Sequence, residues 1–295
     1  MSKTANPDAL STASKGPEMA PPPVQFHTMP GGERIAFRYH PGAHGEGGAE
    51  GAGPLLVFLP GYMSDMDGGK ARAIMAEAQA HGRPCLLLDY SGCGRSDGAF
   101  ADGTLSRWRD EVLALIAARR AEGAPREILL VGSSMGGWLM ILVGEALANG
   151  DGANRDGGAA GGAELAAMIG IAAAPDFTSW GYSEAQRAAL AAGEVVYEDN
   201  PYGPDPTPTH PGFFADAQQH LRLDQGIAIT CRVDLLHGQC DADVPWDISL
   251  QHARALRSDA VQVSLIKDGD HRLSRDSDIA LLKRVVATHY QRYQA

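Results

Sequence analysis

The sequence is poor in cysteine, in basic residues and in long apolar runs. Its four cysteines are scattered and form no C-x-x-C pair, so we expect free thiols rather than a disulfide framework. Lys and Arg number 25 against 36 Asp and Glu, a formal net charge of -11. A chain this acidic repels phosphate backbones, which argues against a nucleic-acid partner. No apolar run reaches the roughly 18 residues of a membrane span.

The N-terminal segment also lacks the marks of a targeting sequence. Residues 1–22 contain no apolar stretch of the signal-peptide kind, and they carry Asp8 and Glu18 but no Arg, which argues against a transit peptide. We therefore expect a disordered tail on a cytoplasmic protein, followed by one domain over residues 23–295. The pattern indicates no particular oligomeric state.

Behind the tail, apolar runs alternate with stretches of helical periodicity. Strands are predicted at 24–29, 34–40, 54–60, 85–90, 127–132, 165–174, 233–238 and 261–266. Helices are predicted at 69–81, 104–121, 135–148, 246–257 and 276–292. This alternation predicts an α/β fold: an eight-stranded, mostly parallel sheet with helices on both faces. Sites in such sheets lie beyond the carboxyl ends of the strands.

Three segments interrupt this alternation. Residues 41–54 and 149–162 are rich in glycine and end in no Gly-Lys-Ser/Thr sequence, so we predict surface loops rather than phosphate-binding loops. The third, 175–230, lies between two predicted strands and carries its own aromatic residues. Its length and position predict a cap or lid inserted into the domain.

The pattern G-x-S-x-G occurs twice, centred on Ser134 and on Ser96. A nucleophile elbow needs a strand that ends at the serine and a helix that begins directly after it. The apolar run EILLV leads straight to Ser134, and a helical pattern follows at once. Ser96 stands six residues beyond the end of its strand, is followed by a loop, and has Asp97 beside it. We therefore predict Ser134 as the nucleophile and Ser96 as a decoy.

Ser134 is preferred over the neighbouring Ser133 on steric grounds. An elbow crowds the residues two before and two after the nucleophile, and for Ser134 these are Gly132 and Gly136. For Ser133 they would be Val131 and Met135, which are too bulky for the turn. The alternative reading is an ordinary strand-to-helix turn in which small residues serve packing.

A serine nucleophile needs a base, and the base needs a carboxylate that orients it. The next suitable strand end carries Asp241 and Asp243; Asp241 is favoured because Asp243 stands nearer the next helix and could cap it. The base is predicted as His271, in the loop after the last strand. His237 is expected to pack within its strand. The set of His237, Cys240 and the two aspartates has no partner cluster, so no metal site is predicted.

The developing oxyanion needs hydrogen-bond donors. The backbone N–H of Met135, at a helix N-terminus, is one candidate, and that of Tyr62 is the other, since Gly61 permits close backbone approach. The turn at Pro60-Gly61 also admits a purely structural reading. Five aromatic side chains of the cap segment either line an acyl pocket or form the core of the cap: Phe177, Trp180, Tyr182, Phe213 and Phe214.

Six separated segments, taken together, resemble the α/β-hydrolase family, and within it the branch of mitochondrial palmitoyl-protein thioesterases and acyl-glucuronide esterases. They are PGYMSDMDGGKA, LDYSGCGRSDG, LSRWRDEVLALI, VGSSMGGWLM, LLHGQCDADVPW and DHRLS. The resemblance runs from about residue 55 to 290. It implies the α/β-hydrolase fold, with Ser134 as nucleophile, Asp241 as orienting acid and His271 as base. The segment 175–230 matches only loosely.

The sequence thus predicts a serine hydrolase that cleaves carboxylic esters or thioesters through an acyl-enzyme and needs no cofactor. Its substrate would be a small molecule or an acylated protein, which includes the activity of an acyl-protein thioesterase. Two alternatives remain: a small-molecule carboxylesterase, and a non-catalytic ligand-binding module on the same fold.

Overall fold

A computed structural model describes residues 19–43, 53–149, 163–200 and 203–293 of the chain. Most of the predicted tail, residues 1–18, lies outside the described residues. The same holds for 44–52 and 150–162, the greater part of the two glycine-rich segments.

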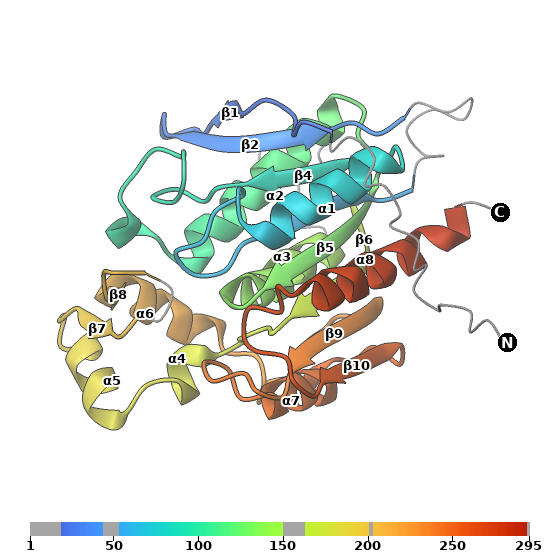
Figure 1. The fold of residues 1–295 in the computed structure, drawn as a ribbon. Coiled ribbons are helices and arrows are strands. Elements are labelled where there is room, and N and C mark those ends of the chain that lie inside the picture. Colours follow the sequence, from blue (N-terminus) through green and yellow to red (C-terminus); the bar gives the residue numbers. More distant parts are fainter. Residues whose placement is uncertain (1–18, 44–52, 150–162, 201–202, 294–295) are drawn as a thin grey trace, which may run out of the picture.

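Eight strands form one twisted sheet, in the order β1-β2-β4-β3-β5-β6-β9-β10 (Figure 1). Each overlaps a predicted strand; they are β1 (Gln25–Thr28), β2 (Arg34–His40), β3 (Leu55–Leu59), β4 (Cys85–Leu88), β5 (Glu127–Ser133), β6 (Glu164–Ile171), β9 (Arg232–Gly238) and β10 (Val261–Ile266). β1 and β2 pair antiparallel with each other, and β2 pairs antiparallel with β4. Every other pairing is parallel, so most carboxyl ends meet at one edge.

Helices cover both faces of the sheet. The principal helices are α1 (Gly69–Ala80), α2 (Leu105–Ala121), α3 (Met135–Ala148), α7 (Asp247–Ala255) and α8 (Asp276–Tyr290), with the short 3-10 helices η2 (Phe100–Asp102) and η4 (Gln291–Tyr293). α1 and α8 lie in front of the sheet in Figure 1 and share one apolar core with it, while α2 and α3 share another core behind it. Burial on two faces explains why β3 and β4 are wholly apolar.

The segment between β6 and β9 folds outside the sheet. It contains α4 (Phe177–Trp180), α5 (Glu184–Ala191), α6 (Pro211–Ala217), η3 (Gln218–His220) and the antiparallel pair β7 (Val196–Glu198) and β8 (Thr207–Thr209). In Figure 1 these elements sit together beyond one end of the sheet. That placement suits the predicted cap, which stays a prediction. Among the helices of the described residues, none combines the length and apolar character needed to cross a bilayer.

His252 on α7 carries a pH-dependent stability. Its side chain is fully buried, and neither ring nitrogen has a hydrogen-bond partner among the described residues. Burial lowers the pKa of His252 to about 4, against roughly 6.5 in the unfolded chain. Between these values the unfolded chain binds the extra proton, so acidification favours unfolding by up to about 3 kcal/mol. The stability is fully present above pH 7 and falls as the pH drops towards 4.

We expect His252→Leu to flatten this dependence, because leucine fills the buried site and cannot titrate. The measurement is the free energy of unfolding by denaturant at pH 7 and at pH 4.5, in both proteins. Equal pH slopes in the variant and the native chain would show that His252 does not carry the effect.

Candidate active site

Ser134 occupies a sharp turn between a strand and a helix. β5 ends at Ser133 and α3 begins at Met135, which leaves Ser134 alone between them with φ 55 and ψ -123. A non-glycine residue with positive φ is strained, and such strain persists where the surroundings hold it. Here they do: the backbone N–H of Ser134 donates to Ile171 O at 2.9 Å, and its carbonyl oxygen accepts from Gly137 and Ala174.

The glycines around this turn are required by close backbone contacts. A Cβ atom on Gly132 would lie 2.3 Å from the carbonyl oxygen of Gly136, and one on Gly136 would lie 2.2 Å from that of Leu59. No real side chain occupies such distances, so the backbone itself fills the space. These contacts press the turn against the end of β3 and agree with the steric argument from the sequence.

The structure brings Ser134, His271 and Asp241 together at the carboxyl edge of the sheet. His271 Nε2 lies 3.0 Å from Ser134 Oγ, and His271 Nδ1 lies 2.9 Å from Asp241 Oδ2. The Asp241 side chain is fully buried, whereas that of His271 is 14% exposed. This is the geometry in which an imidazole accepts a proton from the hydroxyl on one side while a carboxylate fixes its tautomer on the other.

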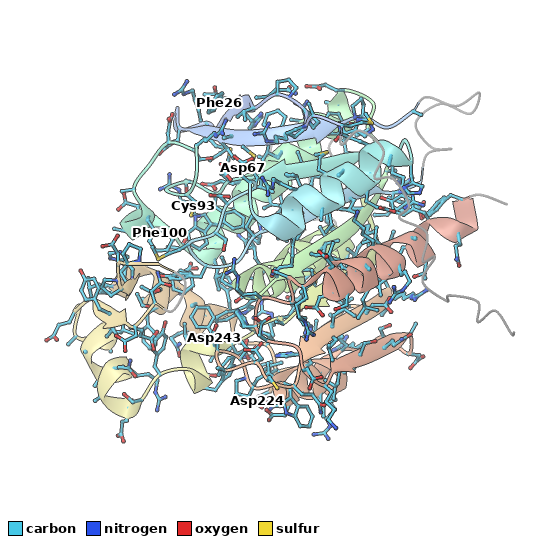
Figure 2. All side chains as sticks on the ribbon, viewed as in Figure 1. Phe26, Asp67, Cys93, Phe100, Asp224 and Asp243 are labelled. Carbon is cyan, nitrogen blue, oxygen red and sulfur yellow. The ribbon has the colours of Figure 1, made fainter. Side chains whose placement is uncertain are left out.

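The two candidate orienting acids, Asp241 and Asp243, make different contacts. Asp241 reaches His271, and its other oxygen, Oδ1, accepts the backbone N–H groups of Asp243 and Val244 at 2.9 and 2.8 Å. The Asp243 side chain is exposed, at the rim of the site near the segment outside the sheet (Figure 2). Asp243 therefore supports Asp241 through its backbone.

His237 also contacts Asp241, which sequence reasoning missed. Its Nε2 lies 3.1 Å from Asp241 Oδ2 and 3.0 Å from Val244 O, and Nδ1 lies 2.7 Å from Ser249 Oγ. Because both neighbours of Nε2 are acceptors, Nε2 carries a proton. Burial raises the pKa of Asp241, but the hydrogen bonds from His237 and His271 outweigh it and hold the pKa well below its usual range. Asp241 therefore stays ionised.

Ser96 occupies a different setting from Ser134. Its Oγ accepts the backbone N–H of Ala36 at 2.8 Å and donates to Asp89 O at 2.7 Å. The first contact ties the loop after β4 to β2, and the second ties the loop to its own start at the end of β4. The Ser96 hydroxyl thus has a structural role, and neither of these two partners is a histidine that could serve as its base.

The two proposed oxyanion donors flank Ser134. Met135 is the first residue of α3, so its N–H has no partner within the helix. The loop after β3 lies against the elbow on the other side: a Cβ on Gly61 would be 3.3 Å from Ser134 Cβ. Tyr62 follows Gly61, and within the described residues neither its N–H nor that of Met135 donates to a protein acceptor. Their role in binding an oxyanion stays a prediction.

A cavity of about 730 Å³ opens over Ser134 and His271. Three of the five predicted acyl-pocket residues line it: Phe177, Trp180 and Tyr182. Phe213 and Phe214 do not; both are buried in apolar cores, Phe213 with the sheet and Phe214 within the segment outside it. The wall near His271 also carries Lys70, whose Nζ donates to Arg272 O and whose pKa burial lowers to about 8.

One group of metal-ligand types occurs among the described residues. Ligand atoms of Asp241, Asp243 and His271 lie within 4.8 Å of one another. Asp241 and His271 already hydrogen-bond to each other, and Asp241 also accepts the backbone N–H groups of Asp243 and Val244. Cys240, part of the set considered from the sequence, directs its thiol to Lys267 O. The expectation that no metal is bound stays a prediction.

Comparison with known proteins agrees with this architecture. Residues 56–283 match the sequence model of the alpha/beta hydrolase family. The chain belongs to the alpha/beta hydrolase family. Its fold is accordingly the α/β-hydrolase fold, with the eight-stranded, mostly parallel sheet that the sequence predicted.

Relatives within the alpha/beta hydrolase family narrow the resemblance. The chain is 37% identical over 241 residues to the mitochondrial palmitoyl-protein thioesterase ABHD10 of Mus musculus, covering 79% of this chain and 74% of that protein. It is 34% identical over 242 residues to the Homo sapiens protein of the same name, covering 79% and 72%. The resemblance to mitochondrial palmitoyl-protein thioesterases predicted from the six motifs is therefore confirmed.

Two solved structures superpose closely on this chain. A putative hydrolase from Agrobacterium vitis S4 has a TM-score of 0.78 at 32% identity, covering 90% of this chain and 99% of that one. Mouse alpha/beta hydrolase domain-containing protein 10 has a TM-score of 0.74 at 31% identity, covering 90% and 97%. These relatives indicate a hydrolase.

Proposed function

We propose that this alpha/beta hydrolase cleaves carboxylic esters or thioesters through an acyl-enzyme on Ser134. The observation that carries the proposal is the pair of contacts made by one imidazole: 3.0 Å from His271 Nε2 to Ser134 Oγ, and 2.9 Å from His271 Nδ1 to Asp241 Oδ2. A protein that only binds a ligand does not need a serine, a histidine and an aspartate hydrogen-bonded in series, so these contacts disfavour the binding-module alternative.

In the proposed reaction, Ser134 Oγ attacks the acyl carbonyl carbon while His271 Nε2 accepts the hydroxyl proton. The carbonyl oxygen becomes an oxyanion held by the N–H groups of Tyr62 and Met135. When the tetrahedral intermediate collapses, the bond to the alcohol or thiol breaks and His271 gives that leaving group its proton. Water, deprotonated by His271, then attacks the acyl-enzyme and releases the carboxylic acid. Asp241 stabilises the imidazolium at both stages.

The finer proposal is an acyl-protein thioesterase. Its support is the name of the ABHD10 relatives and a cavity wall with aromatic side chains from the proposed cap, residues 175–230. A small-molecule carboxylesterase is the second candidate.

The test has two parts. A fluorophosphonate probe should form one covalent adduct, found on Ser134 by peptide mass spectrometry, and should abolish turnover; no adduct, or one on Ser96, would contradict the assigned nucleophile. With p-nitrophenyl esters and acyl thioesters of increasing chain length, we expect kcat/KM to rise up to about fourfold for each methylene buried in the cavity, from about 0.8 kcal/mol apiece. A preference for acetyl substrates would instead favour the small-molecule carboxylesterase.

A further inference from the structure

Tyr62 joins two parts of the molecule that the mechanism treats separately. Its backbone stands beside the elbow, whereas its side chain reaches the segment 175–230. We propose that Tyr62 is a positioning residue: the segment holds its side chain, and thereby fixes the backbone N–H that faces the oxyanion. This inference rests on the proposed function and adds to it a dependence of the oxyanion hole on the docking of the cap.

The backbone end of this link is held against the elbow. Pro60 O accepts the phenol of the buried Tyr90 at 3.1 Å, and a Cβ on Gly136 would lie 2.4 Å from the same oxygen. Gly61 O accepts the N–H of Ser64 at 3.1 Å and closes a tight turn. The Gly61 carbonyl and the Tyr62 N–H belong to one planar peptide unit, so this turn sets the approximate direction of the N–H. The φ of Tyr62 then decides how far that unit can tilt.

The side-chain end is held by the segment 175–230. The Tyr62 hydroxyl donates to the carbonyl oxygen of Pro208 on β8 at 3.0 Å. Its ring makes edge contacts with Phe213 on α6, at a centroid distance of 5.1 Å, and with Phe177 on α4, at 6.1 Å. A ring from the body of the domain, Phe100, packs on it at 4.9 Å. Three elements of the segment thus touch this one side chain.

These two ends are coupled because they share one Cα atom. A ring fixed by a hydrogen bond and by aromatic packing fixes the Cα–Cβ direction, and this direction restricts the φ of Tyr62 and so the aim of its N–H. An oxyanion donor acts only at about 2.7–3.1 Å from the oxyanion, so a small displacement of the donor weakens transition-state binding. Docking of the segment onto Tyr62 therefore completes the site.

The chain offers a matched pair of tyrosines for the test. Tyr290 also donates its phenol to a proline carbonyl, Pro54 O, at 3.0 Å, but it lies on α8 beside the start of β3, away from the elbow. Tyr62→Phe and Tyr290→Phe each delete one oxygen and one hydrogen bond of the same kind. We expect Tyr62→Phe to lower kcat for a p-nitrophenyl ester about tenfold with KM nearly unchanged, short of the roughly 10²–10³ that follows loss of a whole oxyanion donor. Tyr290→Phe should leave kcat within about twofold.

A tetrahedral inhibitor provides a readout that a loss of stability alone would not move. A trifluoromethyl ketone adds to Ser134 and places an oxyanion in the hole, whereas the matching methyl ketone reports mainly on the acyl cavity. Tyr62→Phe should weaken the trifluoromethyl ketone by about the factor lost in kcat and leave the methyl ketone unchanged. Thermal unfolding of both variants measures any general cost of the lost bond.

Two outcomes would overturn the inference. Equal kcat values for Tyr62→Phe and Tyr290→Phe would show that the phenol does not set the donor, and an equal loss of both ketones would place the effect in the cavity. Failure of the proposed function appears differently: the native chain would then form no fluorophosphonate adduct on Ser134, whatever the behaviour of Tyr62.

Discussion

We expect Ser134→Ala to lower kcat for ester and thioester hydrolysis by about six orders of magnitude, because it removes the nucleophile from the Ser134–His271–Asp241 triad. The reason is local. Alanine keeps the turn between β5 and α3 but removes the hydroxyl oxygen that His271 Nε2 faces at 3.0 Å. Any residual rate comes from substrate binding and from the oxyanion donors. The measurement is burst and steady-state release of p-nitrophenol, with the substrate affinity of the variant followed separately.

Ser133→Ala and Ser96→Ala serve as controls, because both serines fall in or next to a G-x-S-x-G match. Ser133→Ala should retain most of kcat. Ser96→Ala removes the hydrogen bonds to Ala36 N and Asp89 O, so we expect lower stability, by about 1 kcal/mol for each net hydrogen bond, with the chemistry retained. Turnover that survives Ser134→Ala and disappears in either control would move the nucleophile to that serine.

The elbow could be predicted from the sequence because its constraint is local. A strand, a strained serine and a helix follow one another without a gap, and the two glycines that the turn requires stand two residues to either side. The eight strands and the main helices follow from the same kind of signal. Most strands are buried on both faces and bounded by turns, so their apolar runs mark them clearly.

Contacts that depend on the path of a turn or on the docking of a segment could not be predicted in this way. His237 reads as a packing residue in β9, and the turn after β9 brings the Asp241 carboxylate and Val244 O to its Nε2. The aromatic residues of 175–230 share one composition, yet Phe177 lines the cavity while Phe213 packs beneath Tyr62. Whether a given ring lines the cavity or packs in a core depends on how the segment docks on the domain. The sequence pattern of the segment does not indicate this.

Asp241→Asn should lower kcat by about four orders of magnitude, which is the scale of a wrong imidazole tautomer. Oδ1 of Asp241 accepts two backbone N–H groups, those of Asp243 and Val244, so the carbonyl oxygen of the asparagine must take that position. Its NH₂ group then stands where Oδ2 was, facing His271 Nδ1. An imidazole that accepts at Nδ1 carries its proton on Nε2, and it cannot take the proton of Ser134.

Asp243→Asn tests the competing assignment with the same chemical change. Asp243 supports Asp241 through its backbone N–H, which asparagine keeps, so we expect kcat to stay within about tenfold of the native value. The pH dependence of kcat/KM should likewise keep its shape in Asp243→Asn. Each substitution removes one negative charge, and the two positions lie close together in the chain. A difference in kcat between the two variants therefore cannot come from the loss of charge alone. A larger loss of kcat for Asp243→Asn than for Asp241→Asn would therefore assign the orienting carboxylate to Asp243. It would refute the Ser134–His271–Asp241 triad.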